Sequence, residues 1–138
     1  MERRAFLGTL TGPAMAVCAV CMGACSKSSS GGSSGAVSAN FTVDLSSNLT
    51  AVGSSFTSNG VIIVRLAPGN LPASFTAVQV ACTHEGTNIN YNASSGNFIC
   101  PNHGSTFTTN GTVTLGPAST SLKQYNITIA GNIMTVVG

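Results

Sequence analysis

The chain has 138 residues, enough for one domain with a single hydrophobic core, and only 6% of them are charged. Its formal net charge of +2 leaves no extended basic face of the kind that neutralises phosphates, which argues against nucleic acid as a partner. Acid–base catalysis is also disfavoured, because it requires pairs of titratable side chains.

The first segment of the chain, residues 1–24, is predicted to be a cleaved export signal. Arg3 and Arg4 stand in front of an apolar run that extends to Ala24. The start of this segment, Arg-Arg-Ala-Phe-Leu, resembles the twin-arginine signal, whose machinery exports proteins that have already folded around their cofactor. An ordinary secretion signal with a chance arginine pair is the alternative.

Residues 25–38 are predicted to be a lipidated tether. The tetrapeptide that ends at Cys25, Met-Gly-Ala-Cys, resembles a bacterial lipobox, in which the cysteine becomes the lipidated first residue; Met22 departs from the usual leucine. The serine- and glycine-rich stretch after Cys25 is typical of a flexible linker. We therefore expect an exported protein, anchored through lipid on the periplasmic or outer face of a membrane. An uncleaved anchor helix is the alternative, although the apolar run is short for the ~17–25 residues that a span needs.

Residues 39–138 are predicted to form one all-β domain. Val, Ile, Thr, Ser, Asn and Gly predominate there, and short alternating segments are separated by turn signals such as Asn59-Gly60 and Asn110-Gly111. The predicted strands cover residues 41–45, 54–57, 60–65, 74–80, 88–91, 97–99, 106–109, 112–115, 122–129 and 133–137.

Two segments of this domain contain the candidate metal ligands. Cys82 is followed by His84 and Cys100 by His103, so each segment offers one thiol and one imidazole. Both histidines of the chain are here. If the leader is removed and Cys25 is lipidated, no other cysteine remains in the mature protein.

From the residues alone, alternative interpretations stay open. In an exported protein, Cys82 and Cys100 could form a disulfide within a non-redox β-sandwich lipoprotein, although this gives no reason for a histidine beside each cysteine. Two cysteines and two histidines also suit a tetrahedral Cys2His2 zinc site, although structural zinc more often takes its first ligand pair as two closely spaced cysteines.

The pattern Cys-x-His followed by Cys-x-x-His resembles the loops of the Rieske iron–sulfur family. This resemblance implies a Rieske-type antiparallel β-sandwich with a small cluster-binding subdomain. It also implies a [2Fe-2S] cluster in which Cys82 and Cys100 bind one iron and His84 and His103 bind the other. Ser105 is implied as a further cofactor-binding residue, and residues 116–119, Gly-Pro-Ala-Ser, resemble the short proline-containing loop that covers the cluster.

Three positions depart from the cytochrome bc-type members of that family. Thr87 and Asn102 stand where each loop of those proteins carries a further cysteine, so the disulfide between the loops is missing. Phe107 replaces a tyrosine that often donates a hydrogen bond to a cysteine sulfur. Because such hydrogen bonds favour the reduced state, the resemblance implies a reduction potential below that of the bc-type proteins.

The implied function is one-electron transfer, by a free carrier or by a small subunit of an oxidoreductase. A cytochrome or an oxidoreductase subunit is the expected redox partner. No Ser-His-Asp or Cys-His catalytic set can be assembled without the two candidate ligand histidines, so we expect an electron-transfer component rather than a stand-alone enzyme.

Overall fold

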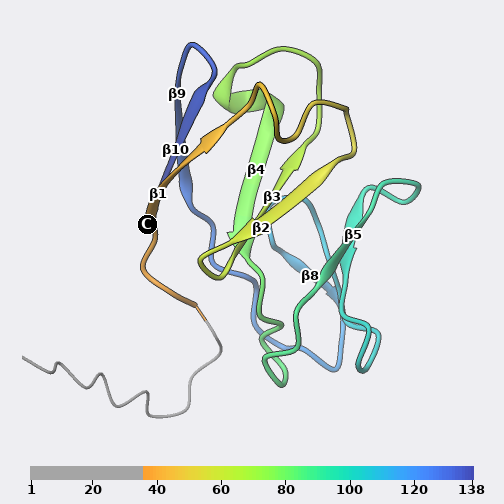
Figure 1. The fold of residues 1–138 in the computed structure, drawn as a ribbon. Coiled ribbons are helices and arrows are strands. Elements are labelled where there is room, and N and C mark those ends of the chain that lie inside the picture. Colours follow the sequence, from red (N-terminus) through yellow and green to blue (C-terminus); the bar gives the residue numbers. More distant parts are fainter. Residues whose placement is uncertain (1–35) are drawn as a thin grey trace, which may run out of the picture.

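The structure, a computed structural model, describes residues 36–138, which are coloured in Figure 1. The predicted export signal, the predicted lipidation site Cys25 and most of the predicted tether lie outside the described residues. The described part of the chain contains ten β-strands and one 3-10 helix. In order, these are β1 (Asn40–Asp44), β2 (Ser55–Ser58), β3 (Val61–Arg65), η1 (Pro72–Ser74), β4 (Phe75–Gln79), β5 (Asn90–Asn92), β6 (Asn97–Ile99), β7 (Thr106–Phe107), β8 (Val113–Leu115), β9 (Asn126–Ala130) and β10 (Ile133–Val137).

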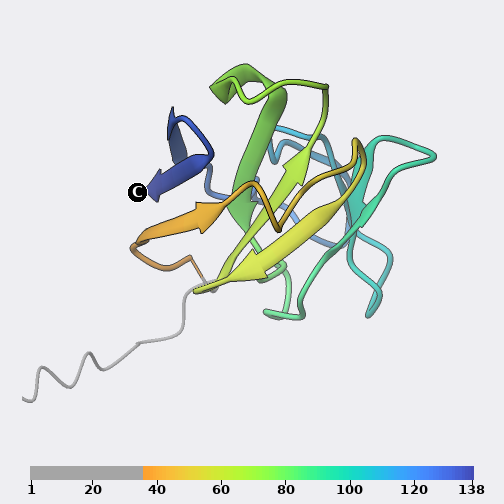
Figure 2. The same ribbon diagram turned by 45° about the horizontal axis from the view of Figure 1, so that its top comes forward.

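The strands form three antiparallel sheets. Their orders are β1-β10-β9, β2-β3-β4 and β5-β6-β7-β8. The first two sheets face each other across a hydrophobic core, and the third forms a smaller subdomain on the other side of β2-β3-β4 (Figures 1 and 2). The predicted all-β sandwich with a small subdomain is therefore confirmed.

Strand β3 contributes to two cores because the middle sheet is covered on both faces. Val61 and Ile63 pack in the first core, whereas Ile62 and Val64 pack in the second, which lies under the subdomain. Successive side chains of a strand point to opposite faces, so a strand covered on both sides must be apolar at every position. This explains the uninterrupted run Val-Ile-Ile-Val in the sequence.

Strand β4 also contributes to both cores, and it leads to the first candidate metal ligand. Ala77 belongs to the first core and Val78 and Val80 to the second, which also contains Cys82 and Cys100. The chain thus passes directly from a buried strand into the first thiol. The position of this thiol is therefore fixed by the packing of the middle sheet.

The predicted strand over residues 122–129 is wrong in its first half. Residues 122–125 run beside β4 instead, where Gln124 forms a bridge with Val78 and the Tyr125 N–H donates to the Ala77 carbonyl at 2.9 Å. Leu122 packs in the second core and Tyr125 in the first. The segment therefore crosses from one core to the other, and β9 begins only at Asn126.

Candidate metal centre

The first metal-binding loop, residues 82–87, is a tight turn between β4 and β5. The Cys82 N–H donates to the Thr87 carbonyl at 2.8 Å, and the Gly86 N–H donates to the Cys82 carbonyl at 2.8 Å. A bridge between Ala81 and Asn88 closes the base of this loop. Gly86 has a φ of 77°, which glycine adopts with little strain.

The second metal-binding loop, residues 100–105, joins β6 to β7 and repeats the same backbone pattern. The Cys100 N–H donates to the Ser105 carbonyl at 2.8 Å, the Gly104 N–H donates to the Cys100 carbonyl at 3.0 Å, and Gly104 has a φ of 79°. Each of these contacts lies eighteen positions after its counterpart in the first loop. By that spacing, His103 is the structural equivalent of Glu85 and not of His84.

The sulfur and nitrogen donors lie on different sides of the two loops. The Cys82 and Cys100 side chains are buried, with exposed fractions of 0% and 2%, whereas His84 and His103 are exposed. The two imidazole rings meet edge to face, with centroids 5.0 Å apart and an angle of 77° between their planes. A metal group held here would have thiolates on its inner side and imidazoles on its outer side.

Both cysteines are free thiols, so the alternative of a Cys82–Cys100 disulfide is wrong. Burial raises the pKa of the Cys82 thiol above its ordinary value, and the neighbouring Cys100 thiol raises it further. The backbone N–H groups of His84 and Glu85 act in the opposite direction by donating hydrogen bonds toward the Cys82 sulfur. Donors of this kind stabilise a thiolate that binds a metal.

A third segment, residues 116–121, covers the two loops and is hydrogen-bonded to each of them. The buried Ser105 hydroxyl accepts a hydrogen bond from the Ala118 N–H at 3.0 Å, which leaves its own hydrogen free to donate. The Thr83 hydroxyl donates to the Thr120 carbonyl at 2.6 Å. The Gly116–Pro117 peptide bond in this segment is cis.

One acidic side chain of the first loop contacts two neighbouring residues of the second loop. The Glu85 Oε2 atom lies 2.9 Å from His103 Nε2 and accepts a hydrogen bond from Asn102 Nδ2 at 3.0 Å. The hydrogen bond with His103 is the largest of the contacts that hold the pKa of the Glu85 carboxyl below its ordinary value. Glu85 is the only acidic residue in either loop, but the sequence alone does not show whether its carboxylate lies near the candidate ligands.

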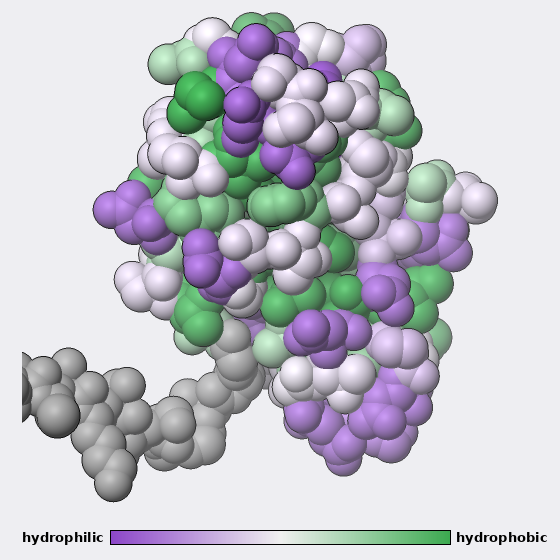
Figure 3. Space-filling model, viewed as in Figure 1, coloured by the Kyte–Doolittle hydropathy of each residue, from purple (hydrophilic) through white to green (hydrophobic). Residues whose placement is uncertain are grey.

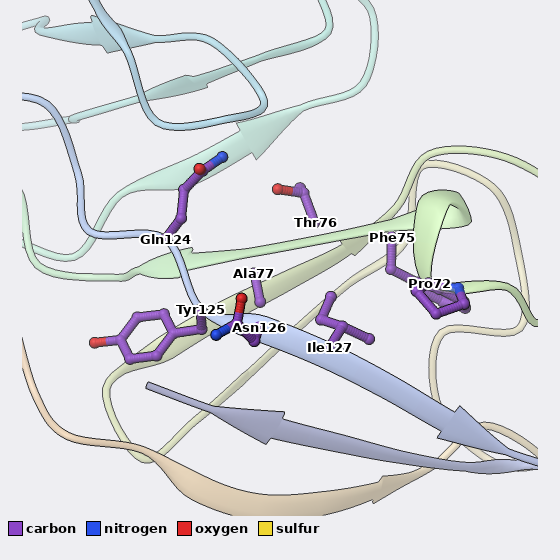
Figure 4. A pocket seen from close by; sticks show the side chains of 8 residues that line it. All are labelled: Pro72, Phe75, Thr76, Ala77, Gln124, Tyr125, Asn126 and Ile127. Carbon is purple, nitrogen blue, oxygen red and sulfur yellow. The ribbon is translucent and has the colours of Figure 1, made fainter.

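The exposed end formed by these loops is hydrophilic. Figure 3, in the same view as Figure 1, shows polar residues covering the end of the molecule where the two metal-binding loops lie. A cavity of about 230 Å³ lies elsewhere, between β4 and residues 124–127. Figure 4 shows Phe75, Tyr125 and Ile127 among its lining residues, which include no cysteine or histidine. The cavity is therefore separate from the metal donors.

Comparison with known proteins identifies the site. Residues 41–126 match the family model of the Rieske [2Fe-2S] domain, a range that contains both loops and the covering segment. The chain belongs to the Rieske [2Fe-2S] domain family. Its cofactor is therefore a Rieske [2Fe-2S] cluster, and the alternative of a zinc site is wrong.

The relatives of this Rieske domain include larger proteins and one of similar size. The cytochrome b6-f complex iron-sulfur subunit of Chlorobaculum thiosulfatiphilum is 32% identical over 81 residues, which are 59% of this chain and 42% of that protein. The chain therefore spans less than half the length of that curated relative. The crystal structure of the plasma membrane Rieske protein PetC3 from Synechocystis PCC 6803 matches with a TM-score of 0.59 and 30% identity, over 71% of this chain and 99% of that one.

The same fold occurs in a more distant protein. The ferredoxin of carbazole 1,9a-dioxygenase from Nocardioides aromaticivorans IC177 has a TM-score of 0.53 at 20% identity, and the match covers 74% of this chain and 98% of that one.

The donor set of this Rieske domain suits the family's cofactor. The structure brings Cys82 and Cys100 into one buried core, places His84 against His103 at the surface, and puts the Ser105 hydroxyl beneath the covering segment. Two buried thiols and two exposed imidazoles are the ligand types that hold the two irons of a Rieske cluster. Cys25, the predicted lipidation site, lies outside the described residues.

Proposed function

We propose that this Rieske domain carries single electrons, either as a free carrier or as a small subunit of an oxidoreductase. Cys82 and Cys100 hold the inner iron, and His84 and His103 hold the outer one. The observation that carries the proposal is the exposure of both imidazoles on a hydrophilic end of the molecule, while both thiols are buried. Electrons enter and leave through that exposed end.

The residues of the chain have separate tasks in this function. When bound, the cluster supplies one-electron redox chemistry. The backbone N–H groups of His84 and Glu85 stabilise negative charge on the Cys82 sulfur, and the Ser105 hydroxyl has a hydrogen available for the same purpose. The second core keeps water away from the sulfur side, because Phe98 and Phe107 are both fully buried there.

The proposal is tested on the purified, folded protein. We expect a red-brown preparation that contains about two iron atoms and two acid-labile sulfides per chain and loses its colour on addition of dithionite. Voltammetry should show one reversible one-electron wave. A natively folded preparation without iron or colour would contradict the proposal.

The proposed partner is a cytochrome or a subunit of an oxidoreductase. The names of the relatives support this choice, since the Chlorobaculum protein is a subunit of a cytochrome complex. Co-purification of the tethered protein from its native membrane, followed by identification of haem or flavin proteins in the eluate, tests it. Recovery of the Rieske protein without any redox protein would argue for a free carrier.

We further propose that the domain, residues 39–138, is exported and held at a membrane by residues 25–38. The twin-arginine pattern in residues 1–24 and the lipobox ending at Cys25 support this proposal. In residues 36–138, no helix is long and apolar enough to cross a membrane. The substitution Cys25→Ser should move the protein from the membrane fraction to the soluble fraction with its iron content unchanged. Retention of the variant in the membrane fraction would argue for an uncleaved anchor.

The aromatic residue after the second metal-binding loop is expected to tune the reduction potential. Phe107 is fully buried in the same core as both thiols. The substitution Phe107→Tyr should raise the potential on the order of 30 mV, because a hydrogen bond about 0.7 kcal/mol stronger in the reduced state gives that shift for one electron. Voltammetry measures the effect. Phe56→Tyr is the control and should leave the potential unchanged, because Phe56 is partly buried against the first core, away from the thiols.

A further inference from the structure

The carboxylate of Glu85 connects the two metal-binding loops through their side chains. It belongs to the first loop, whereas both of its partners belong to the second: His103 Nε2 at 2.9 Å and Asn102 Nδ2 at 3.0 Å, each measured from Glu85 Oε2. All three side chains are exposed, and the Glu85 side chain is 54% accessible. A single oxygen atom therefore joins one loop to two neighbouring residues of the other.

The contact with His103 also determines which ring nitrogen is available to a metal. An ionised carboxylate only accepts hydrogen bonds, so the partner nitrogen, Nε2, must carry the proton. The other ring nitrogen, Nδ1, then keeps its lone pair for a metal. Hydrogen bonds from a ligand histidine to a carboxylate orient the ring and strengthen it as a ligand.

A second observation shows that this contact is specific to the second loop. The backbone hydrogen bonds of the two loops repeat with a shift of eighteen positions, which makes Glu85 the equivalent of His103 and Asn102 the equivalent of His84. At the two equivalent positions, the first loop therefore has His84 and Glu85, and the second has Asn102 and His103. His84 contacts these residues through its ring, which packs edge to face against the His103 ring.

From these contacts we infer that Glu85 is a positioning residue for the cluster. It holds His103 with Nδ1 directed to the metal and, together with Asn102, fastens the second loop to the first. This inference rests on the proposed role of His103 as an iron ligand. Because the contact requires an acceptor oxygen at this place, glutamine preserves the positioning and removes only the charge.

Four variants of the full chain separate positioning from charge. Glu85→Leu removes the acceptor and the charge, and Glu85→Gln removes only the charge. Asn102→Ala removes one of the two contacts that Glu85 makes with the second loop and leaves the contact with His103. Asp44→Asn is the matched control, since Asp44 is an exposed acid on β1 in the terminal sheet and its neutralisation changes the net charge equally. Circular dichroism tests whether each variant is folded.

The first measurement is the rate at which cluster colour is lost to an iron chelator. In Glu85→Leu we expect the loss to be about tenfold faster than in the wild type, the effect typical of removing a group that orients a metal ligand. Glu85→Gln and Asp44→Asn should lose colour at the wild-type rate, and Asn102→Ala at an intermediate rate. Equal rates for Glu85→Leu and the wild type, or for Glu85→Leu and Glu85→Gln, would overturn the inference.

The second measurement is the reduction potential together with the electron paramagnetic resonance spectrum of the reduced protein. Both Glu85 variants should have a higher potential, because a negative charge beside the site disfavours the additional electron. Only Glu85→Leu should show altered g values, because the orientation of the His103 ring changes only in this variant. An equal rise in Asp44→Asn, or unaltered g values in Glu85→Leu, would contradict the assigned contact. A wild-type protein without a cluster would instead contradict the proposed function.

Discussion

The substitution Cys82→Ser is expected to leave the folded protein without iron. The Cys82 side chain is fully buried and belongs to the core beneath both loops, so no external thiol can take its place. Iron–sulfur clusters are held by cysteine thiolates, and a serine hydroxyl is far less acidic and less suited to iron. Iron and acid-labile sulfide should both fall from about two per chain to near zero, as measured by colorimetric analysis.

The control for this prediction is the same chemical change outside the site. Cys25→Ser replaces a cysteine of the predicted tether and should retain the full iron and sulfide content. Circular dichroism should show that Cys82→Ser keeps its strands, because serine has the shape of cysteine with one smaller atom, oxygen in place of sulfur. A red-brown Cys82→Ser protein with two iron atoms would refute the proposed ligand set.

The substitution Ser105→Ala is expected to lower both the reduction potential and the stability. Loss of the hydroxyl hydrogen removes a donor that favours the reduced state; a tenfold change in the redox equilibrium, about 1.4 kcal/mol, corresponds to about 60 mV for one electron. The Ala118 N–H also loses its acceptor in a buried place, which costs about 1–3 kcal/mol of unfolding free energy. Voltammetry and urea unfolding measure the two effects.

Ser121→Ala is the matched control because it removes a similar contact at the surface. The Ser121 hydroxyl accepts a hydrogen bond from the Val113 N–H at 3.3 Å, in the same covering segment but exposed to solvent. Water can replace this acceptor, so we expect little change in stability and none in potential. If Ser105→Ala has the potential of the wild type, the Ser105 hydroxyl does not donate to the cluster.

The strands of this fold follow closely from local sequence patterns. Val43 and Leu45 are buried while Thr42 and Asp44 are exposed, as the alternation predicted for residues 41–45 requires. Asn59-Gly60 closes the β2–β3 hairpin as predicted, with a positive φ at both residues. Such features depend on neighbouring residues alone, so they are visible without a structure.

The pairing of distant strands could not be predicted in this way. Strand β1 pairs with β10, so that Asn40 lies opposite Val137 and Asp44 opposite Ile133, and nothing local in either strand specifies its partner. The path of residues 122–125 was missed for a related reason. Leu122 and Tyr125 are apolar enough for a strand, but they serve two different cores.

For the site, the sequence gives the residue types, and the structure adds their contacts. The spacing of Cys82, His84, Cys100 and His103 was sufficient to suggest the family and its cofactor. The bond between Glu85 and His103 was not predictable, because it depends on how the two loops face each other. The position of Glu85 next to His84 indicates an acidic group beside the site, but it does not specify a partner in the other loop.

Because β3 contributes to two cores, the two halves of the domain are expected to unfold cooperatively. Val61 and Ile63 pack toward the terminal strands, and Ile62 and Val64 toward the metal-binding subdomain, so neither half can unfold without uncovering the other. A ligand that binds only the native state lowers the population of every unfolded form linked to it. Loading of the cofactor therefore protects the whole domain, including the strands farthest from the iron. Proteolysis and heat should accordingly distinguish loaded from empty protein throughout the folded domain, residues 39–138.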